Sequence, residues 1–256
     1  MSSEASVETR ATRLRRDNAL AGAVHLAQAI AVLVLATSFA LPVTATYLTG
    51  PPGTVPADPA KLFEIPTGAA VAGFLLLSAL AHAVVCTLWW RRYLADLSRS
   101  RNPARWVEYS LSASLMIVLI AQLTGISDVA ALVALFGVNA SMILFGWLQE
   151  NYEQPGSGGW LPFVFGCLAG IVPWLAIGIY LFSPGSTSDA EAPGFVYGIF
   201  VSLFVFFNVF ALNQWLQYRA RGRWADYLFG ERVYIVLSLV AKSALAWQVF
   251  AGTLAT

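Results

Sequence analysis

Charged residues are scarce in this chain of 256 residues. Only 11% of the residues are charged, 58% are hydrophobic, and the mean hydropathy is +0.67. So small a polar fraction cannot cover the surface of a soluble globule of this size. The composition therefore excludes a soluble globular protein and predicts a multi-pass protein in the lipid bilayer of the cell membrane.

Other signals are missing too. The two cysteines, Cys86 and Cys167, both lie in apolar segments, so no disulfide framework is expected. The first eighteen residues, MSSEASVETRATRLRRDN, lack the apolar core and cleavage pattern of a signal peptide. Paired carboxylates, metal-ligand clusters and nucleophile triads are not recognisable in the chain. We therefore expect no enzymatic activity, no metal site and no nucleic-acid partner.

Long apolar segments dominate the rest of the chain. A helix needs about 20 apolar residues to cross the hydrocarbon core of a bilayer, and polar or Pro/Gly positions divide the sequence into seven such segments. They are residues 18–41, 66–90, 104–125, 127–149, 160–183, 194–218 and 231–254. This pattern predicts an all-α fold, a bundle of seven transmembrane helices that forms a single domain over residues 18–256. Residues 1–17 are predicted to be a cytoplasmic tail, and residues 42–65 a small β-hairpin outside the membrane.

Basic residues are distributed unevenly between the two sides of these segments. Thirteen of the fifteen fall on the side of the N-terminus: Arg10, Arg13, Arg15, Arg16, Arg91, Arg92, Arg99, Arg101, Arg105, Arg219, Arg221, Arg223 and Arg232. The other side has Lys61 together with four acidic residues, Asp58, Glu64, Asp189 and Glu191. The positive-inside rule therefore predicts a cytoplasmic N-terminus and an extracellular C-terminus.

The fifteenth basic residue, Lys242, lies about midway along the seventh segment. A lysine at that depth costs about 2.5 to 3.5 kcal/mol on insertion scales, so a functional role and a partner are expected. Glu108, in the third segment, is the only carboxylate that the predicted boundaries place well inside a span. Helical side chains tilt toward the N-terminus of their helix, so Lys242 is predicted to reach Glu108.

Further polar residues lie at similar depth. Ser112 follows Glu108 by one helical turn and Ser238 precedes Lys242 by one turn. His25, His82 and Ser78 are predicted to form a proton-accepting cluster in the cytoplasmic half of the bundle. Two plainer interpretations remain open. The lysine and glutamate can form a purely structural ion pair, and each histidine can simply bridge helices by hydrogen bonding.

A buried lysine on the last of seven helices also suits a retinal protein. A neutral lysine amine attacks an aldehyde to form a Schiff base, and a protonated imine needs a nearby anion, for which Glu108 is the candidate counterion. Residues at matching depth on other helices are predicted to wall a polyene, although aromatic residues in such a chain often face lipid. These wall residues are Met142, Gly146, Phe206, Phe207 and Gln214.

Several segments resemble those of the heliorhodopsins. They are WVEYSLSASLMIVLIAQ, FGVNASMILFGWLQE, PGSTSDAEAPGFVYGI and LSLVAKSALAWQ, and the likeness extends over all seven segments and the loop YLTGPPGT. The resemblance implies a rhodopsin-like fold, covalently bound all-trans retinal on Lys242 with Glu108 as counterion, a homodimer, and an orientation inverted relative to other microbial rhodopsins. It also implies a cytoplasmic-side cavity involving His25 and His82, and a slow photocycle, without demonstrated ion pumping in most members of the family.

The third segment can be compared with light-driven proton pumps of the microbial rhodopsin class. In their third helix those pumps carry the pattern Arg-x-x-carboxylate, followed by a hydroxyl residue four positions later and a second carboxylate seven positions after that. Arg105, Glu108 and Ser112 match the first parts, but the last position is Leu119. The pumps also carry an Asp four residues before the lysine, where this chain has Ser238. A single carboxylate at the site argues against proton pumping.

The favoured hypothesis is a photoreceptor with a long-lived signalling state read by a cytoplasmic partner. Basic loops such as residues 219–223 are candidate docking surfaces, although arginines there also serve as topology determinants. The alternative is a light-gated or light-driven ion (proton) transporter. A retinal-free transporter or an enzyme with a lysine imine is less favoured.

Overall fold

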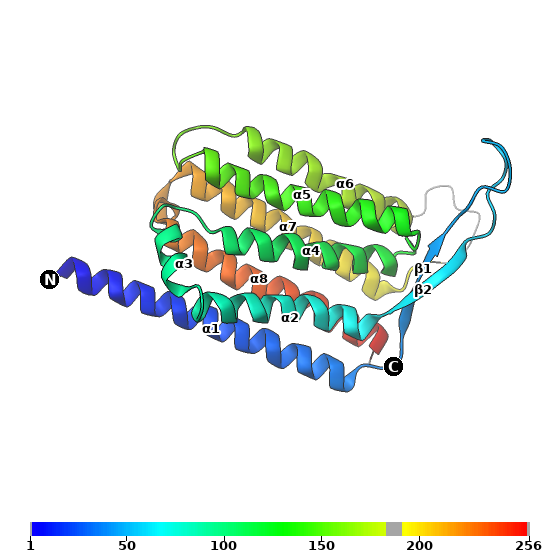
Figure 1. Cartoon of the computed structure of the whole chain (residues 1–256), viewed down its shortest axis with the longest axis horizontal. Helices are drawn as coiled ribbons and strands as arrows, with labels where there is room; N and C mark the ends of the chain where they lie inside the picture. The colour runs from blue at the N-terminus through cyan, green and yellow to red at the C-terminus, as the bar shows by residue number, and fades with distance from the viewer. Residues whose placement is uncertain (1, 183–190, 255–256) are drawn as a thin grey trace.

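The computed structural model describes residues 2–182 and 191–254, which form a bundle of helices with one small sheet (Figure 1). Within those residues, seven helices are long and apolar enough to cross a membrane. They are α1 (Ser2–Leu35), α2 (Thr67–Cys86), α4 (Pro103–Leu123), α5 (Val129–Tyr152), α6 (Leu161–Phe182), α7 (Gly194–Arg219) and α8 (Tyr227–Val249). The predicted seven-helix bundle is confirmed.

The first helix differs from the predicted segment at both ends. It begins at Ser2, so the expected tail is continuous with the first span, and it ends at Leu35 instead of residue 41. Strand β1 (Ala40–Ala45) follows at once. Pro42 lies within this strand, where its missing amide hydrogen is tolerated because proline is accepted in an edge strand.

The second span is shorter than predicted and is followed by an additional helix. α2 ends at Cys86 instead of residue 90, and α3 (Trp90–Leu97) lies across the end of the bundle (Figure 1). Tyr93 and Leu97 of α3 are buried against the bundle, while Arg91 and Arg92 are exposed. Hydropathy alone merged this short amphipathic helix with the span before it.

The predicted hairpin between the first two spans is confirmed. Strand β1 pairs antiparallel with β2 (Ala60–Pro66), with Val43 opposite Phe63. The hairpin extends from the end of the bundle opposite the start of α1 (Figure 1). Thr44 attaches it to the turn between α4 and α5, because its amide donates to the carbonyl oxygen of Ser127 at 2.8 Å and the two hydroxyl groups lie 3.0 Å apart.

Side-chain caps fix the start of three helices. Asn102 accepts a hydrogen bond from the amide of Arg105 at the start of α4, Asp128 caps α5, and Asp226 accepts from the amide of Leu228 at the start of α8. A capping side chain satisfies an amide that has no partner within the helix. The 3₁₀ turn Gly222–Ala225 links α7 to α8, and a π-helical turn, Phe250–Leu254, follows α8.

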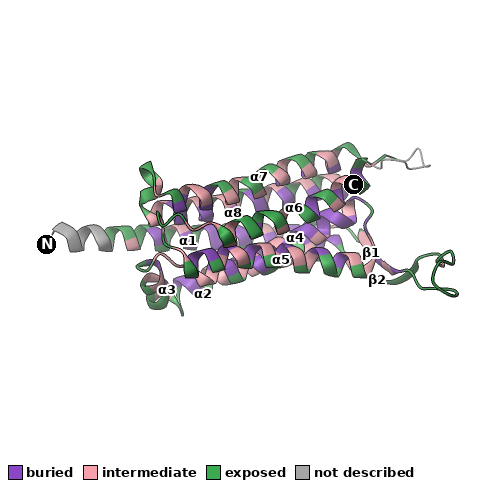
Figure 2. Ribbon diagram, turned by 90° about the horizontal axis from the view of Figure 1, so that it is seen from above, coloured by how far each residue is buried: buried purple, intermediate pink, exposed green. Residues whose placement is uncertain are grey.

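Buried apolar side chains form a main cluster near the hairpin, and a smaller cluster at the other end. The main cluster contains Val71, Phe74, Leu75, Ile117, Leu119, Ile120, Ile177, Ile199, Leu203 and Leu245. The smaller one contains Leu14, Ala21, Val85, Tyr93, Leu97 and Ile235. Exposed apolar residues occur along the outward faces of the helices (Figure 2), as expected of helices in contact with lipid.

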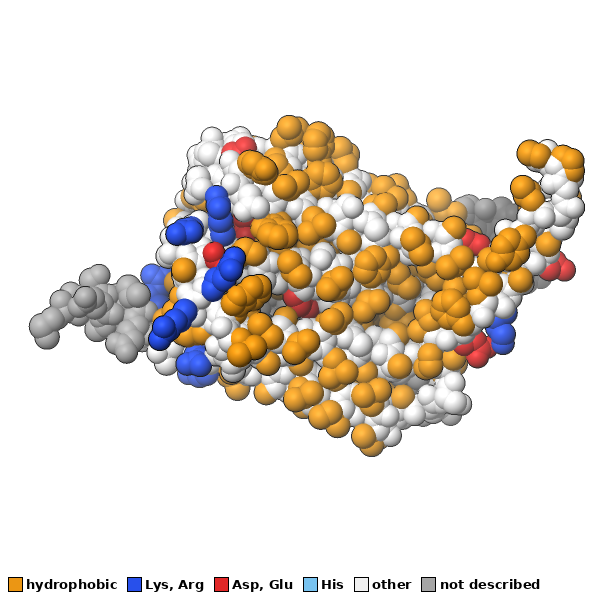
Figure 3. Space-filling view, in the orientation of Figure 1, with side chains coloured by type: hydrophobic (Ala, Val, Ile, Leu, Met, Phe, Trp, Pro, Cys, Tyr) orange, Lys and Arg blue, Asp and Glu red, His pale blue; other side chains and the backbone are white. Residues whose placement is uncertain are grey.

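The two ends of the bundle differ in charge. Exposed arginines gather where α1 begins, which we call the arginine-rich end (Figure 3). Lys61 and Glu64 lie on the hairpin, at what we call the hairpin end, and form a 3.0 Å ion pair. Asp189 and the rest of residues 183–190, which include part of the segment PGSTSDAEAPGFVYGI, lie outside the described residues.

Candidate functional site

Lys242 lies inside the bundle on α8. Its side chain is only 4% exposed. Nζ donates one hydrogen bond to Oε1 of Glu108 on α4 at 2.8 Å and another to Oγ of Ser238 at 2.9 Å. The contact predicted between Lys242 and Glu108 is therefore present. A close, hydrogen-bonded partner is what a buried charge requires.

The carboxylate of Glu108 is held by side chains from three helices. Lys242 approaches it from α8, and Ser78 on α2 donates a hydrogen bond to Oε1 at 2.6 Å. Ser112, one turn further along α4, is fully buried beside the same carboxylate. The ring of Tyr109 lies 4.9 Å from Nζ of the lysine. These contacts leave the carboxylate little freedom to move.

The two histidines lie together between α1 and α2. The rings of His25 and His82 are stacked, with centroids 5.8 Å apart and an angle of 14° between their planes. His82 and Glu108 line the same small cavity. The structure thus brings His25, His82 and Ser78 together next to Glu108, although Ser78 donates to the carboxylate and not to a histidine.

An apolar cavity lies on the other side of Lys242, between α4, α5, α6, α7 and α8. It offers about 130 Å³ to water-sized molecules, whereas one water needs about 10–15 Å³. Five predicted residues line it: Met142, Gly146, Phe207, Gln214 and Ser238. Two others lie elsewhere, because Phe206 packs against the main apolar cluster and Ser112 is on the Glu108 side.

Aromatic residues that the sequence prediction missed complete the wall. They are Trp106, Tyr109, Phe163, Phe210 and Tyr234. Helical spacing could have identified Phe210, which lies three residues after Phe207 and four before Gln214. Phe163 comes from a different helix, and its position depends on how α6 packs against α5.

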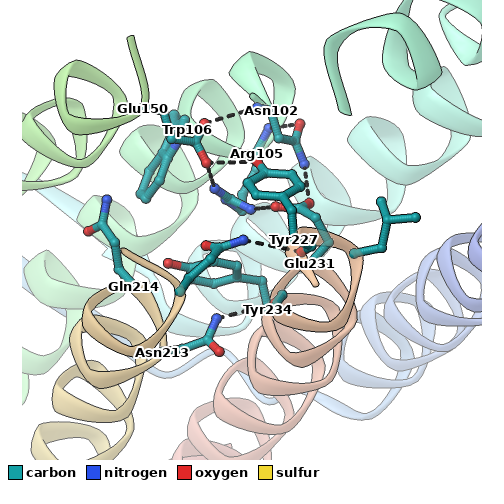
Figure 4. A network of polar contacts seen from close by, with 12 residues as sticks. Asn102, Arg105, Trp106, Glu150, Asn213, Gln214, Tyr227, Glu231 and Tyr234 are labelled. Atoms are coloured by element: carbon teal, nitrogen blue, oxygen red, sulfur yellow. Dashed lines mark hydrogen bonds and ion pairs between the residues drawn. The ribbon is translucent and has the colours of Figure 1, made fainter. Parts of the chain in front are cut away.

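Arg105 is the centre of a second buried polar group at the arginine-rich end (Figure 4). It forms ion pairs with Glu150 on α5 and Glu231 on α8, and none of the three side chains is more than 4% exposed. Its guanidinium also lies over two aromatic rings, 4.4 Å from the centroid of Trp106 and 4.0 Å from that of Tyr234. Cation–π contacts of this kind are strongest where water is excluded.

Neutral donors complete the coordination of the two carboxylates. Glu150 accepts hydrogen bonds from the amide of Asn102 at 2.9 Å, from Nε1 of Trp106 at 2.6 Å and from the hydroxyl of Tyr227 at 2.9 Å. Glu231 accepts one from Nδ2 of Asn102 at 2.7 Å. We call these residues and Arg105 the Arg105 cluster. They join α4, α5 and α8 at one end of the bundle.

This cluster adds two buried carboxylates that the sequence did not indicate. Glu108 is not the only carboxylate inside the bundle, since the side chains of Glu150 and Glu231 are 0% and 1% exposed. Both lie at the ends of apolar segments, where a charge normally reaches the headgroup region, and Arg105 was counted among the basic residues that determine the orientation. Both carboxylates pair with Arg105, so Glu108 is still the carboxylate in contact with Lys242.

Breaking the Arg105 cluster should destabilise the bundle. Glu150→Gln keeps the size of the side chain but removes a buried negative charge, and leaving a buried ion pair without one partner costs about 3–5 kcal/mol. We expect a clear fall in the thermal unfolding midpoint in detergent. Glu153→Gln is the matched control, because Glu153 lies outside the cluster and accepts from Ser157. Equal unfolding midpoints for the two variants would contradict a stabilising role.

Comparison with known families agrees with the geometry. The family model for Heliorhodopsin matches residues 14–254, which is nearly the whole chain. No curated protein matches it. Rhodopsins are multi-pass membrane proteins that use a retinal chromophore, and they are not a family of enzymes. With seven membrane-spanning helices and a match of this length, the chain belongs to the heliorhodopsin family.

Proposed function

We propose that the protein is a photoreceptor that binds all-trans retinal covalently at Nζ of Lys242, with Glu108 as the counterion. The observation that carries the proposal is the buried pair of Lys242 and Glu108 at the edge of an apolar cavity. When bound, retinal supplies light-driven isomerisation of a conjugated chain. The protein's own residues supply the attachment atom, the counter-charge and the walls.

The cavity residues fit a long apolar chromophore. Apolar and aromatic side chains predominate along the walls, and Lys242 is one of the residues that line the cavity. Gln214 is polar, but its amide nitrogen Nε2 already donates a hydrogen bond to the carbonyl oxygen of Gly146 at 3.1 Å. A side chain at Gly146 would come within 2.5 Å of the Trp106 ring, so glycine is needed for this wall to close as it does.

Glu108 and its neighbours are arranged to control a proton near Lys242. A carboxylate 2.8 Å from Nζ stabilises a positive charge on that nitrogen. Ser78 donates a hydrogen bond to Glu108 and Ser238 accepts one from Lys242, so both side chains are held in position. We assign the acceptance of a proton released from this region to the cluster of His25, His82 and Ser78.

The surroundings favour sensing over pumping. Leu119, at the position where proton pumps carry a second carboxylate, belongs to the main apolar cluster toward the hairpin end. Ser238 stands where the pumps carry an Asp four residues before the lysine, and its hydroxyl group accepts a hydrogen bond from Nζ of Lys242 without adding a negative charge. The small cavity that Glu108 lines continues toward the arginine-rich end, where Asn18, Asn102 and Arg105 also line it, and this supports a proton that leaves and returns on one side.

We further propose that the arginine-rich end faces the cytoplasm and that the protein is a homodimer. The gathering of arginines at that end supports the orientation, which a cytoplasm-dependent reporter fused to the N-terminus would check. Chemical cross-linking in membranes would check the dimer. The exposed arginines of residues 219–223 offer a surface for a cytoplasmic signalling partner.

Removing the attachment lysine should abolish the chromophore. We expect Lys242→Ala protein incubated with retinal to show no visible absorption band beyond that of free retinal, because no other buried primary amine is available at the cavity. Lys61→Ala is the matched control, since Lys61 is the only other lysine in the chain and is exposed on the hairpin. A visible band that survives in Lys242→Ala would rule out the proposed attachment.

Neutralising the counterion should shift the band. We expect Glu108→Gln to absorb at longer wavelength. The negative charge near Nζ stabilises the ground state of the chromophore more than its excited state, so removing that charge narrows the excitation gap. Glu153→Gln, which changes a carboxylate remote from the cavity, should leave the absorption maximum in place. An unchanged maximum in Glu108→Gln would remove Glu108 from the counterion role.

Flash spectroscopy with simultaneous current recording separates sensing from transport. We expect the retinal-bound protein in a planar membrane to form a long-lived intermediate without a sustained photocurrent, because no described carboxylate continues the path past Leu119 toward the hairpin end. A sustained current that depends on a proton or ion gradient would instead support a light-gated or light-driven transporter.

A further inference from the structure

The two histidines beside Glu108 differ in their hydrogen bonding. Nδ1 of His82 lies 2.9 Å from Oδ1 of Asn18, one helix away on α1. His25 is fully buried, and neither of its ring nitrogens has a hydrogen-bond partner within the described residues. A neighbouring group therefore determines the protonation pattern of only one of the two rings.

The amide of Asn18 can have only one orientation. Nδ2 donates to the backbone carbonyl oxygen of Leu14 at 2.9 Å, and a carbonyl oxygen can only accept. Rotating the amide by half a turn would bring two acceptor oxygens together. Nδ2 also lies 3.5 Å from the hydroxyl of Tyr93, and burial, which raises the pKa of Tyr93 to about 12, keeps that hydroxyl neutral. Oδ1 must therefore be the atom that faces His82.

The orientation of the amide determines the tautomer of the histidine. An amide oxygen accepts and never donates, so Nδ1 of His82 must carry the hydrogen. A neutral imidazole has one hydrogen on its two nitrogens, which leaves the lone pair on Nε2. We infer that Asn18 is a positioning residue that fixes His82 in the Nδ1–H tautomer and makes Nε2 the atom that takes up a proton.

The packing of α1 against α2 enforces this contact. Asn18, Gly22 and His25 are spaced to lie on one face of α1. A Cβ atom at Gly22 would lie 2.9 Å from Cβ of His82, so glycine is required for the two helices to come this close. Asn18 itself is only 3% exposed, which limits competition from water for its oxygen.

The same hydrogen bond suits both protonation states of His82. In the neutral ring Nδ1 donates to Oδ1 of Asn18, and after Nε2 gains a proton the bond becomes charge-assisted and stronger. In the proposed transfer, one proton leaves the region of Nζ of Lys242 and Glu108 and binds to Nε2 of His82. The positive charge moves with it to the imidazolium ring of His82. His82 is placed for this step, because it lines the same cavity as Glu108. The inference rests on the proposed function and names the accepting atom.

The tautomer can be measured directly in the dark. The chain contains only two histidines, so protein labelled with ¹⁵N-histidine and purified without a histidine tag shows four ring nitrogens by solid-state NMR. Protonated and unprotonated nitrogens differ widely in chemical shift, and His82→Gln assigns the signals. We expect His82 to be protonated at Nδ1 alone, with and without retinal. Protonation at Nε2 alone would overturn the inference without any substitution at Asn18.

Two variants of Asn18 test the cause. Asn18→Ala removes the acceptor, so His82 should change to the Nε2–H tautomer or to a mixture, while the signals of His25 stay the same. Asn18→Asp keeps an oxygen that faces Nδ1 but loses the donor to Leu14, so Nδ1 should stay protonated while the added negative charge favours a second proton on Nε2. Gln28→Ala is the matched control, because it removes another hydrogen bond from α1, the one from Nε2 of Gln28 to Ser243. An unchanged tautomer in Asn18→Ala would overturn the inference.

Flash spectroscopy of the same variants tests the functional part. We expect proton transfer from the chromophore site to slow severalfold in Asn18→Ala and to keep nearly its original rate in Gln28→Ala. Equal rates in these two variants would overturn the positioning role. Absence of any light-induced signal in the unmodified protein would count against the proposed function alone, because the dark NMR result does not depend on it.

Discussion

A lysine in the interior of a membrane protein must have a partner, and the contact between Lys242 and Glu108 meets this requirement. The two residues lie 134 positions apart in the sequence, on α8 and α4. Ser78 from α2 and Ser238 from α8 complete the hydrogen bonding. Three helices must therefore keep a fixed depth relative to one another, and the apolar cavity and the histidine pair take their positions from the same arrangement.

The buried charges form two separate groups with different consequences. Lys242 and Glu108 have an apolar cavity on one side and a polar one on the other, so a change at Nζ can alter where a proton resides. The Arg105 cluster has more hydrogen bonds per charge and joins α4, α5 and α8 at the arginine-rich end. The pair of Lys242 and Glu108 is suited to a change of protonation. The Arg105 cluster is suited to keep α4, α5 and α8 in place during that change.

Polarity decreases from the arginine-rich end toward the hairpin end, and this gradient bears on function. Both histidines and the Arg105 cluster lie on one side of Lys242, whereas the main apolar cluster with Leu119 lies on the other, where the buried polar pair of Asn139 and Ser114 carries no charge. A protein that moves protons across the membrane needs polar groups on both sides of its active nitrogen. The arrangement is better suited to a proton that shuttles within one half, and Asn18 defines where on His82 that proton is received.

The sequence alone determined the seven spans, the hairpin and the pairing of Lys242 with Glu108, because hydropathy and the cost of an isolated buried charge are readable from local composition. It also led to four of the five predicted wall residues, through their depth along the spans, and to Ser238, through helical spacing. The tertiary structure decided the rest. The early end of α1, the helix α3, the burial of Glu150 and Glu231 and the contact between Asn18 and His82 depend on which helices lie side by side. Charges near the end of a span look alike in a sequence whether they face headgroups or a buried guanidinium, and only the packing of the helices distinguishes these environments.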